Sequence, residues 1–221
     1  MDALYYIGGG SMRHNIELRL SLRALEANGK NIDRVFVVGN KPEFLNNKVN
    51  YIWVDDKYQW WRNAYEKTKA AIEAGISDEF LLMNDDFFMM QEFDAEKYPY
   101  YYRGDLPETG GIDYTDILAS TRKILEREGK GIKHFGVHCP IRINAKQYLE
   151  LEKYKYEPFS ARCLYGNLFV KGARKVNDCK GDMIKPNATK CFSSKDWMTD
   201  EVIKALKENF NKPSKWEKED V

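Results

Sequence analysis

The chain has 221 residues, which is enough for one good-sized domain and short for two. Lysine and arginine together number 35 against 34 aspartates and glutamates, so a formal charge of only +1 excludes a strong global attraction to DNA or membranes. The four cysteines lack the C-x-x-C spacing of zinc knuckles and redox motifs, and we expect them to be reduced thiols in a cytoplasmic protein.

Apolar runs alternate with amphipathic segments over the first half of the chain. Buried strands are predicted at 3–7, 34–39, 49–54 and 79–83, and helices at 15–28 and 61–74. This alternation predicts βαβ units, and therefore an α/β fold with a mainly parallel sheet flanked by helices. Ligands of such sheets bind at the carboxyl ends of the strands.

The second half is less regular. The stretch 97–115 is rich in tyrosine, glycine and proline, which predicts a loop or lid. The remaining predictions are a helix at 114–128, a strand at 135–141 interrupted by Pro140, a helix at 144–154, a loop at 185–194 and a final helix at 196–208. We expect one domain over residues 1–210, followed by a charged tail over residues 211–221. No apolar run predicts a signal peptide or a membrane span.

The triplet Asn84-Asp85-Asp86 follows the fourth predicted strand and precedes the apolar residues 87–90. Adjacent carboxylates are costly in such surroundings, and a divalent cation would neutralise them. Oxygen ligands of this kind suit Mg²⁺ or Mn²⁺, which could bridge the phosphates of a nucleotide diphosphate. The alternative is a polar turn at the end of the strand, since asparagine and aspartate favour turns.

His138 lies among apolar neighbours in a predicted strand, where a lone histidine is more often a core residue than a ligand. A metal site with two carboxylates commonly recruits one more ligand from a later strand, and imidazole suits Mn²⁺. His138 is therefore a candidate third ligand beside Asp85 and Asp86.

A glycine loop, Gly8-Gly9-Gly10-Ser11, follows the first strand and allows the backbone to approach a ligand closely. Arg13, Arg19 and Arg23 come soon after it, and guanidinium groups are the usual partners of phosphate. The alternative for the arginines is an ordinary solvated helix face. The loop fits neither the P-loop nor G-x-G-x-x-G, and no G-x-S-x-G elbow predicts a serine hydrolase.

Several blocks together resemble the Stealth family, whose members transfer sugar phosphates from nucleotide sugars to glycans. Residues 15–25, NIELRLSLRAL, resemble the family's NDELRYSLRSL, and residues 80–88, FLLMNDDFF, resemble FLYFNDDMFF. Residues 63–66, NAYE, are similar to its NAIE helix, and residues 138–140, HCP, are similar to its HAP. Arg162 matches an arginine of the last conserved stretch.

The resemblance covers about residues 2 to 170 and implies a GT-A-like nucleotide-sugar fold with the acidic triplet at the metal and diphosphate. By the same analogy Arg19, Asn63, His138 and Arg162 belong to the active site. The family's opening acidic block is absent here, where Tyr6 to Ser11 stands in its place. That departure favours ordinary glycosyl transfer over transfer of a sugar phosphate.

The predicted function is a metal-dependent glycosyltransferase that uses a nucleotide-diphosphate sugar and Mn²⁺ or Mg²⁺. Its reacting centre would contain Arg19, Arg162 and the metal ligands Asp85, Asp86 and His138. The donor would contact Gly8, Gly9, Gly10, Ser11, Arg13, Asn63, Lys67 and Asn84. The alternatives are Stealth-type sugar-phosphate transfer to a polysaccharide and a non-catalytic module that binds nucleotides or glycans.

The acceptor is expected to be a glycan or a hydroxymethylated base in DNA, with the segment 98–111 covering the site. For DNA, phosphate contacts are predicted at Lys171, Arg174, Lys175 and Lys180, and base stacking at Tyr100, Tyr101 and Tyr102. For a glycan, the same tyrosines would pack on sugar faces.

Overall fold

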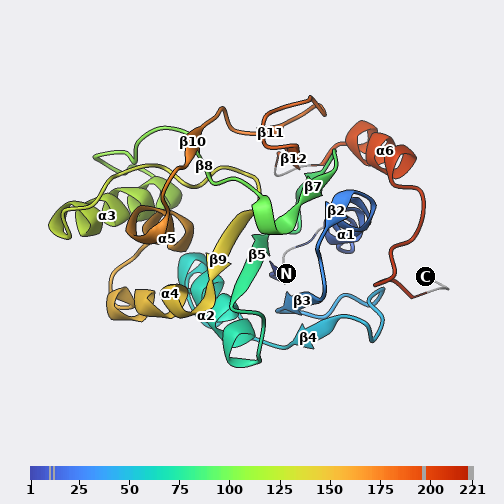
Figure 1. Ribbon diagram of the computed structural model, residues 1–221, viewed down its shortest axis with the longest axis horizontal. Coiled ribbons are helices and arrows are strands. Elements are labelled where there is room, and N and C mark those ends of the chain that lie inside the picture. The colour runs from blue at the N-terminus through green and yellow to red at the C-terminus, as the bar shows by residue number, and fades with distance from the viewer. Residues whose placement is uncertain (10, 12, 196–197, 219–221) are drawn as a thin grey trace.

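A five-stranded sheet lies at the centre of the computed structural model, which describes residues 1–9, 11, 13–195 and 198–218 (Figure 1). The strand order is β4-β3-β1-β5-β9, with the first four strands parallel and β9 antiparallel to β5. The strands are β1 (Asp2–Tyr6), β3 (Val35–Val38), β4 (Asn50–Ile52), β5 (Glu79–Met83) and β9 (Ile141–Asn144).

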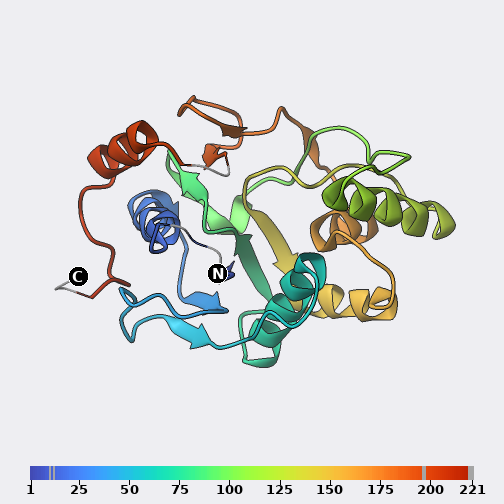
Figure 2. The same ribbon diagram turned by 180° about the vertical axis from the view of Figure 1, so that it is seen from behind.

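Helices cover both faces of this sheet (Figure 2). Leu4 and Phe80 pack on one face with residues of α2, α3, α4 and α5, while Tyr5 and Leu81 pack on the other face with α1. Burial on both faces explains why the strands are continuous apolar runs, and it confirms the predicted α/β class. The helices are α1 (Ile16–Asn28), α2 (Trp60–Glu73), α3 (Asp113–Arg127), α4 (Ala145–Leu149), α5 (Ala161–Phe169) and α6 (Asp200–Asn209). Within the described ranges, none of these helices combines the length and apolar character that crossing a bilayer requires.

A smaller layer lies outside α1. Strand β6 (Phe87–Met89) pairs antiparallel with β12 (Cys191–Ser194), and Phe88 and Phe192 stack there with ring centroids 5.9 Å apart. These rings join residues of α1 and α6 in a separate apolar cluster. The short remaining elements are β2 (Gly29–Lys30), β7 (Phe93–Asp94), the 3₁₀ helix Ala95–Lys97, β8 (Tyr101–Tyr102), the 3₁₀ helix Glu150–Tyr154, β10 (Arg174–Lys175) and β11 (Lys180–Gly181).

Three predicted elements of the second half need correction. Residues 135–140 form no strand, and β9 begins only at Ile141, because Pro140 has no N–H to donate to a ladder. The predicted loop 185–194 ends in strand β12, which is too short for its pattern to be recognised. The last helix begins at Asp200, where the Thr199 side chain accepts a hydrogen bond from the Val202 N–H and caps it.

The chain reverses its direction of travel across the sheet at β1. Strand β3 lies on one side of β1 and β5 on the other, so a crevice is expected outside the carboxyl ends of β1 and β5. Gly39, which follows β3, has φ of +128°, and a Cβ there would lie 2.1 Å from the Ile7 carbonyl oxygen. A glycine is therefore required where the chain leaves β3 beside the end of β1.

The predicted charged tail after residue 210 is packed onto the domain in its described part. Trp216 and Glu217 are buried, and the Glu217 carboxylate accepts hydrogen bonds from Arg23 Nε and Nη2, each at 2.7 Å. Arg19 Nε lies 3.3 Å from the same carboxylate. The described residues 211–218 therefore lie against helix α1, because the Glu217 carboxylate faces two arginines of that helix.

Glu217→Ala should lower the free energy of unfolding by about 3 kcal/mol, since it leaves the Arg23 guanidinium without its buried partner. Urea denaturation measures this change. Glu208→Ala, a change at an exposed glutamate of α6, should alter stability by less than about 0.5 kcal/mol. Equal effects of the two substitutions would contradict a structural role for Glu217.

Candidate active site

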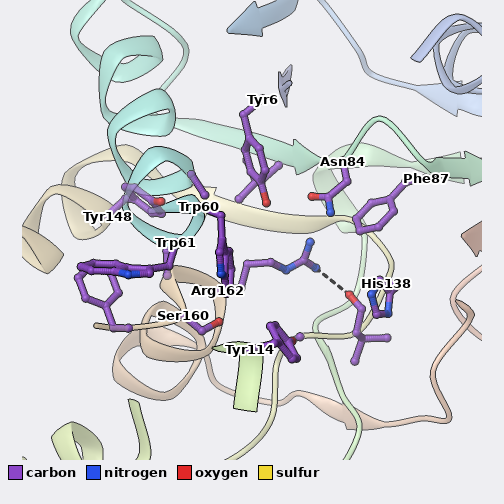
Figure 3. A pocket seen from close by; sticks show the side chains of 16 residues that line it. Tyr6, Trp60, Trp61, Asn84, Phe87, Tyr114, His138, Tyr148, Ser160 and Arg162 are labelled. Atoms are coloured by element: carbon purple, nitrogen blue, oxygen red, sulfur yellow. Dashed lines mark hydrogen bonds between the residues drawn. The ribbon is translucent and has the colours of Figure 1, made fainter. Parts of the chain in front are cut away.

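A pocket of about 160 Å³ opens at the carboxyl ends of β1 and β5, at the expected crevice (Figure 3). Tyr6, the last residue of β1, and Asn84, which follows β5, both line it. The volume is close to that of a cavity that holds one six-membered ring. Seven of the sixteen lining residues are aromatic: Tyr6, Trp60, Trp61, Phe87, Tyr114, Tyr148 and Phe159. The polar lining side chains include Asn84, His138, Ser160 and Arg162.

Asp85 and Asp86 occupy the turn between β5 and β6, next to the pocket. The pKa of Asp85 is raised to about 7, mainly by burial and to a smaller extent by the nearby carboxylates of Asp86 and Glu17. Burial also raises the pKa of Asp86, although its carboxylate accepts a hydrogen bond from the Ser193 hydroxyl at 2.6 Å. The turn therefore holds two like charges in surroundings that disfavour both.

Two buried polar atoms of the pocket residues have no hydrogen-bond partner within the described part of the chain: Asn84 Oδ1 and Arg162 Nε. Buried polar atoms of this kind are rare in native proteins and call for an explanation such as a ligand. One is an acceptor and the other a donor, so a molecule that offers both functions would satisfy them.

Arg162 enters the pocket from the first turn of α5, whose amino terminus is capped by Ser160. Its Nη2 donates to the carbonyl oxygens of Val137, at 3.1 Å, and of Cys139, and its guanidinium lies 5.5 Å from the centre of the Phe87 ring. The structure gives it no carboxylate partner among the described residues. A partly buried guanidinium without a counter-ion is suited to an anionic ligand.

His138 is held by a carboxylate that the sequence did not suggest. Asp178 accepts hydrogen bonds from His138 Nδ1 at 2.8 Å and from the His138 main-chain N–H at 3.0 Å, and it also pairs with Arg103. Burial alone would raise the pKa of Asp178, but the hydrogen bonds from His138 and the charge of Arg103 hold it well below its usual value. Because Nδ1 donates to a carboxylate, Nε2 is left as an acceptor that can bind a cation or take a proton.

Asn63 and Lys67, predicted donor contacts on α2, make internal contacts instead. The Asn63 amide bonds to both the N–H and the C=O of Tyr58, at 3.0 and 2.7 Å. Lys67 is buried, donates to the Ile7 carbonyl oxygen at 2.6 Å and pairs with Asp56 at 2.5 Å. Neither side chain lines the pocket; both shape loops beside it.

Gly8, Gly9 and Ser11, the described residues of the glycine loop, lie beside the pocket and are not among its lining residues. Gly8 and Gly9 are exposed, and a Cβ on Gly9 would lie 2.8 Å from Asn40 Nδ2. Ser11 Oγ donates to Glu17 at 3.0 Å. Arg13 pairs at the surface with Asp200 at 2.6 Å. The predicted contact at Gly10 lies outside the described residues.

The structure also places Arg19 away from the pocket lining. Its guanidinium lies over the Phe44 ring, 4.7 Å from the centroid, and its Nε faces Glu217. Arg19 thus belongs to the contact between α1 and the C-terminal segment, and a direct role in the reacting centre has no geometric support.

The predicted metal ligands are Asp85, Asp86 and His138. In the described ranges, no three or more histidine, cysteine, aspartate or glutamate side chains gather into a metal-binding cluster. Asp85 and Asp86 nevertheless fit an oxygen-preferring cation, because Mg²⁺ is often held by one or two carboxylates together with substrate phosphates. The unpartnered Asn84 Oδ1 beside them agrees with such a site. His138 as a further ligand stays a prediction.

The residues predicted to form a lid and to stack on the acceptor make contacts with other parts of the chain. The segment 98–111 contributes nothing to the pocket lining. Tyr101 donates its hydroxyl proton to Ala188 O at 2.9 Å, the Tyr100 ring packs against Arg142, and the Tyr102 ring packs against Lys133. Exposed basic side chains at Lys171, Arg174 and Lys175 lie outside the pocket lining.

Trp60 and Tyr114 line the pocket, whereas the tyrosines at 100–102 do not. Their rings lie 5.7 Å apart between centroids, and they remain 48% and 37% exposed at the pocket. Sequence reasoning missed them because Trp60 opens a helix and Tyr114 begins another, positions that read as helix boundaries. The only hint in the sequence was that each is a large aromatic residue at a position where the apolar stripe of the helix did not require one.

No family model matches the chain, and no curated protein matches it, so the resemblance to the Stealth family stays a prediction. The chain is similar to the galactosyltransferase LgtC in complex with donor and acceptor sugar analogs, at 15% identity and a TM-score of 0.43 over 80% of this chain and 73% of that one. An active-site mutant of LgtC is similar over the same shares, at 17% identity and a TM-score of 0.41. HddC from Yersinia pseudotuberculosis matches 39% of this chain and 48% of its own, at 15% identity and a TM-score of 0.28.

Asp85→Asn should stabilise the metal-free protein strongly at pH 8 and have little effect at pH 4. The unfolded chain loses the Asp85 proton near its ordinary pKa of 3.8, whereas the folded protein holds it up to about pH 7, so the parent loses stability as the pH rises from about 4 to 7. Asparagine removes the charge and with it this loss. Melting temperatures at the two pH values test the prediction.

The control for this comparison is Asp182→Asn, at an exposed surface ion pair with Lys195. It should behave alike at both pH values. An Asp85→Asn variant that melts below the parent at pH 8 would show that the carboxylate is not under electrostatic stress.

Proposed function

We propose that this chain is a metal-dependent glycosyltransferase with a GT-A-like fold, which moves a sugar from a nucleotide-diphosphate sugar to a hydroxyl group. The observation that carries the proposal is the convergence of three unsatisfied features at one sheet crevice. These are the stressed pair Asp85 and Asp86, the orphaned Asn84 Oδ1 and the unpaired Arg162. Arg162 and both aspartates influence the pKa of the pocket residue Tyr6, so they lie within electrostatic reach of one another.

A nucleotide-diphosphate sugar with its metal ion offers a binding partner to each of these groups. Its phosphate oxygens would accept from Arg162, and its sugar hydroxyls would donate to Asn84 Oδ1. Asp85 and Asp86 would hold Mg²⁺ or Mn²⁺, which when bound supplies positive charge to the diphosphate leaving group. Alternative ligands without an anion would leave the Arg162 guanidinium unpaired.

The residues of the chain would perform the remaining work by binding and positioning. Arg162 would orient the diphosphate while the aromatic walls exclude water from the sugar. In the reaction, the bond between the anomeric carbon and the phosphate oxygen breaks, the acceptor oxygen bonds to that carbon, and the acceptor loses its proton. His138 Nε2, with the ring held by Asp178, would receive that proton or complete the cation site.

The rest of the donor would extend from the pocket toward the end of β1. Gly8 and Gly9, which are exposed there, would lie against the nucleoside, with Ser11 and Arg13 further along the same loop. Asn63 and Lys67 would act indirectly, by holding the neighbouring loops in place. Arg19 is expected to contribute stability through Glu217 and not to touch the donor.

The proposal predicts that nucleotide-diphosphate sugars raise the melting temperature only when Mn²⁺ or Mg²⁺ is present. A ligand at about 100 times its Kd stabilises the native state by about 2.7 kcal/mol, or roughly 5–10 °C for a chain of this size. Asp86→Ala and Arg162→Gln should remove this shift and lower turnover about a hundredfold or more. Arg174→Gln, a change of an exposed arginine outside the pocket, should keep both.

The products distinguish the alternatives. Glycosyl transfer releases a nucleoside diphosphate, whereas transfer of a sugar phosphate releases a nucleoside monophosphate. Donor binding without any turnover, at any metal concentration and with a wide range of acceptors, would indicate a binding module. The absence of a metal-dependent shift with every donor would contradict the proposal itself.

A further inference from the structure

Trp60 separates two hollows on the surface. Its side chain lines both the pocket and a groove of about 380 Å³ beside the first turn of α3. The groove is bordered by Gln59, Asp113, Asp116 and Ser120. Because one side chain belongs to both, a ligand longer than one ring can pass from the pocket into the groove over the edge of Trp60.

The aromatic residues at this boundary are unusually exposed. Trp60 is 48% and Tyr114 37% exposed, with ring planes tilted by 34°, and the neighbouring Ile112 is 70% exposed. Large apolar side chains that gather at a cleft and stay in water mark a binding surface. Flat rings with a polar edge suit the apolar face of a sugar ring, whose hydroxyls then point sideways.

The polar border of the groove has the character needed for those hydroxyls. In the described part of the chain, neither Asp113 nor Asp116 has a side-chain hydrogen bond or ion pair, and both are exposed. Free carboxylates accept hydrogen bonds from hydroxyl groups. They also repel phosphate, so the groove is a poor path for a nucleic-acid backbone. Gln59 uses its Oε1 for the Trp61 indole N–H at 2.9 Å, which leaves its amide N–H groups for a ligand.

We propose that the acceptor is a hydroxyl-rich glycan of at least two sugar units, bound across Trp60. Its reacting sugar lies at the mouth of the pocket, outside the donor sugar and against the exposed rings of Trp60 and Tyr114. The next sugar lies in the groove with its hydroxyls on Asp113 and Asp116. This inference rests on the proposed glycosyltransferase function and names the substrate class. The rings of Trp60 and Tyr114 supply apolar contact. The carboxylates of Asp113 and Asp116 supply selectivity against phosphate-bearing acceptors.

Direct binding of acceptors tests the proposal without relying on turnover. The metal-loaded protein is probed with an array of neutral mono-, di- and trisaccharides and with duplex DNA that carries hydroxymethylated bases. We expect disaccharides or trisaccharides of at least one type to bind, and DNA not to compete. Trp60→Ala should weaken that binding about tenfold or more, whereas Trp53→Ala, which removes a 63% exposed tryptophan outside both hollows, should not.

The groove has its own test. The double variant Asp113→Asn, Asp116→Asn should weaken a disaccharide by about tenfold while leaving the Kd of the corresponding monosaccharide unchanged. Equal loss for both, or tight binding of the DNA by the parent protein that Trp60→Ala does not affect, would overturn the proposal. Donor-induced thermal shifts, recorded in parallel on the parent protein, report separately on the proposed function.

Discussion

The side-by-side placement of Asp85 and Asp86 at the end of a buried strand is the constraint on which the site depends. Strand β5 is apolar and central, so the chain leaves the core directly into two carboxylates that water cannot fully solvate. The metal-free protein relieves this stress only in part, through the Ser193 hydroxyl and the nearby charge of Lys180. A bound cation would relieve it, and this is the reason that we propose a metal site at the acidic turn.

The surrounding fold supplies rigid positions for the partners of that turn. The reversal of strand order at β1 creates the crevice, helix α5 brings Arg162 to its edge, and Asp178 fixes the His138 ring. Sites of this kind are held by packed elements and by contacts behind the reacting groups. Their cost is local: Asn84 Oδ1 and Arg162 Nε remain unsatisfied in the protein alone, as expected where function conflicts with stability.

The first half of the fold could be predicted because its strands are uninterrupted apolar runs and its helices carry an apolar stripe. Asn84, Asp85 and Asp86 could also be singled out as candidates, since a polar triplet at the end of a buried run stands out. His138 and Arg162 came from the resemblance, and the structure places both at the pocket. The contact that Arg19 makes could not be predicted, because a sequence does not reveal that its partner is Glu217, almost 200 positions later.

Asp178, Trp60 and Tyr114 could not be predicted for the same reason: their contacts are with residues that are distant in the sequence. Asp178 lies 40 positions from His138 in a stretch with no recognisable pattern, and only the folded chain brings them together. Trp60 and Tyr114 meet because α2 and α3 begin at the same edge of the pocket. Pairings that depend on tertiary packing leave no local periodicity, whereas burial and strand ends do.

Mn²⁺ binding, followed by electron paramagnetic resonance with a nucleoside diphosphate present, determines whether Asp85 and Asp86 hold a cation. We expect one bound Mn²⁺ per chain, lost in both Asp85→Asn and Asp86→Asn and retained in Asp182→Asn. Failure of the parent protein to bind Mn²⁺ with any nucleoside diphosphate, or undiminished binding in the two turn variants, would contradict this expectation.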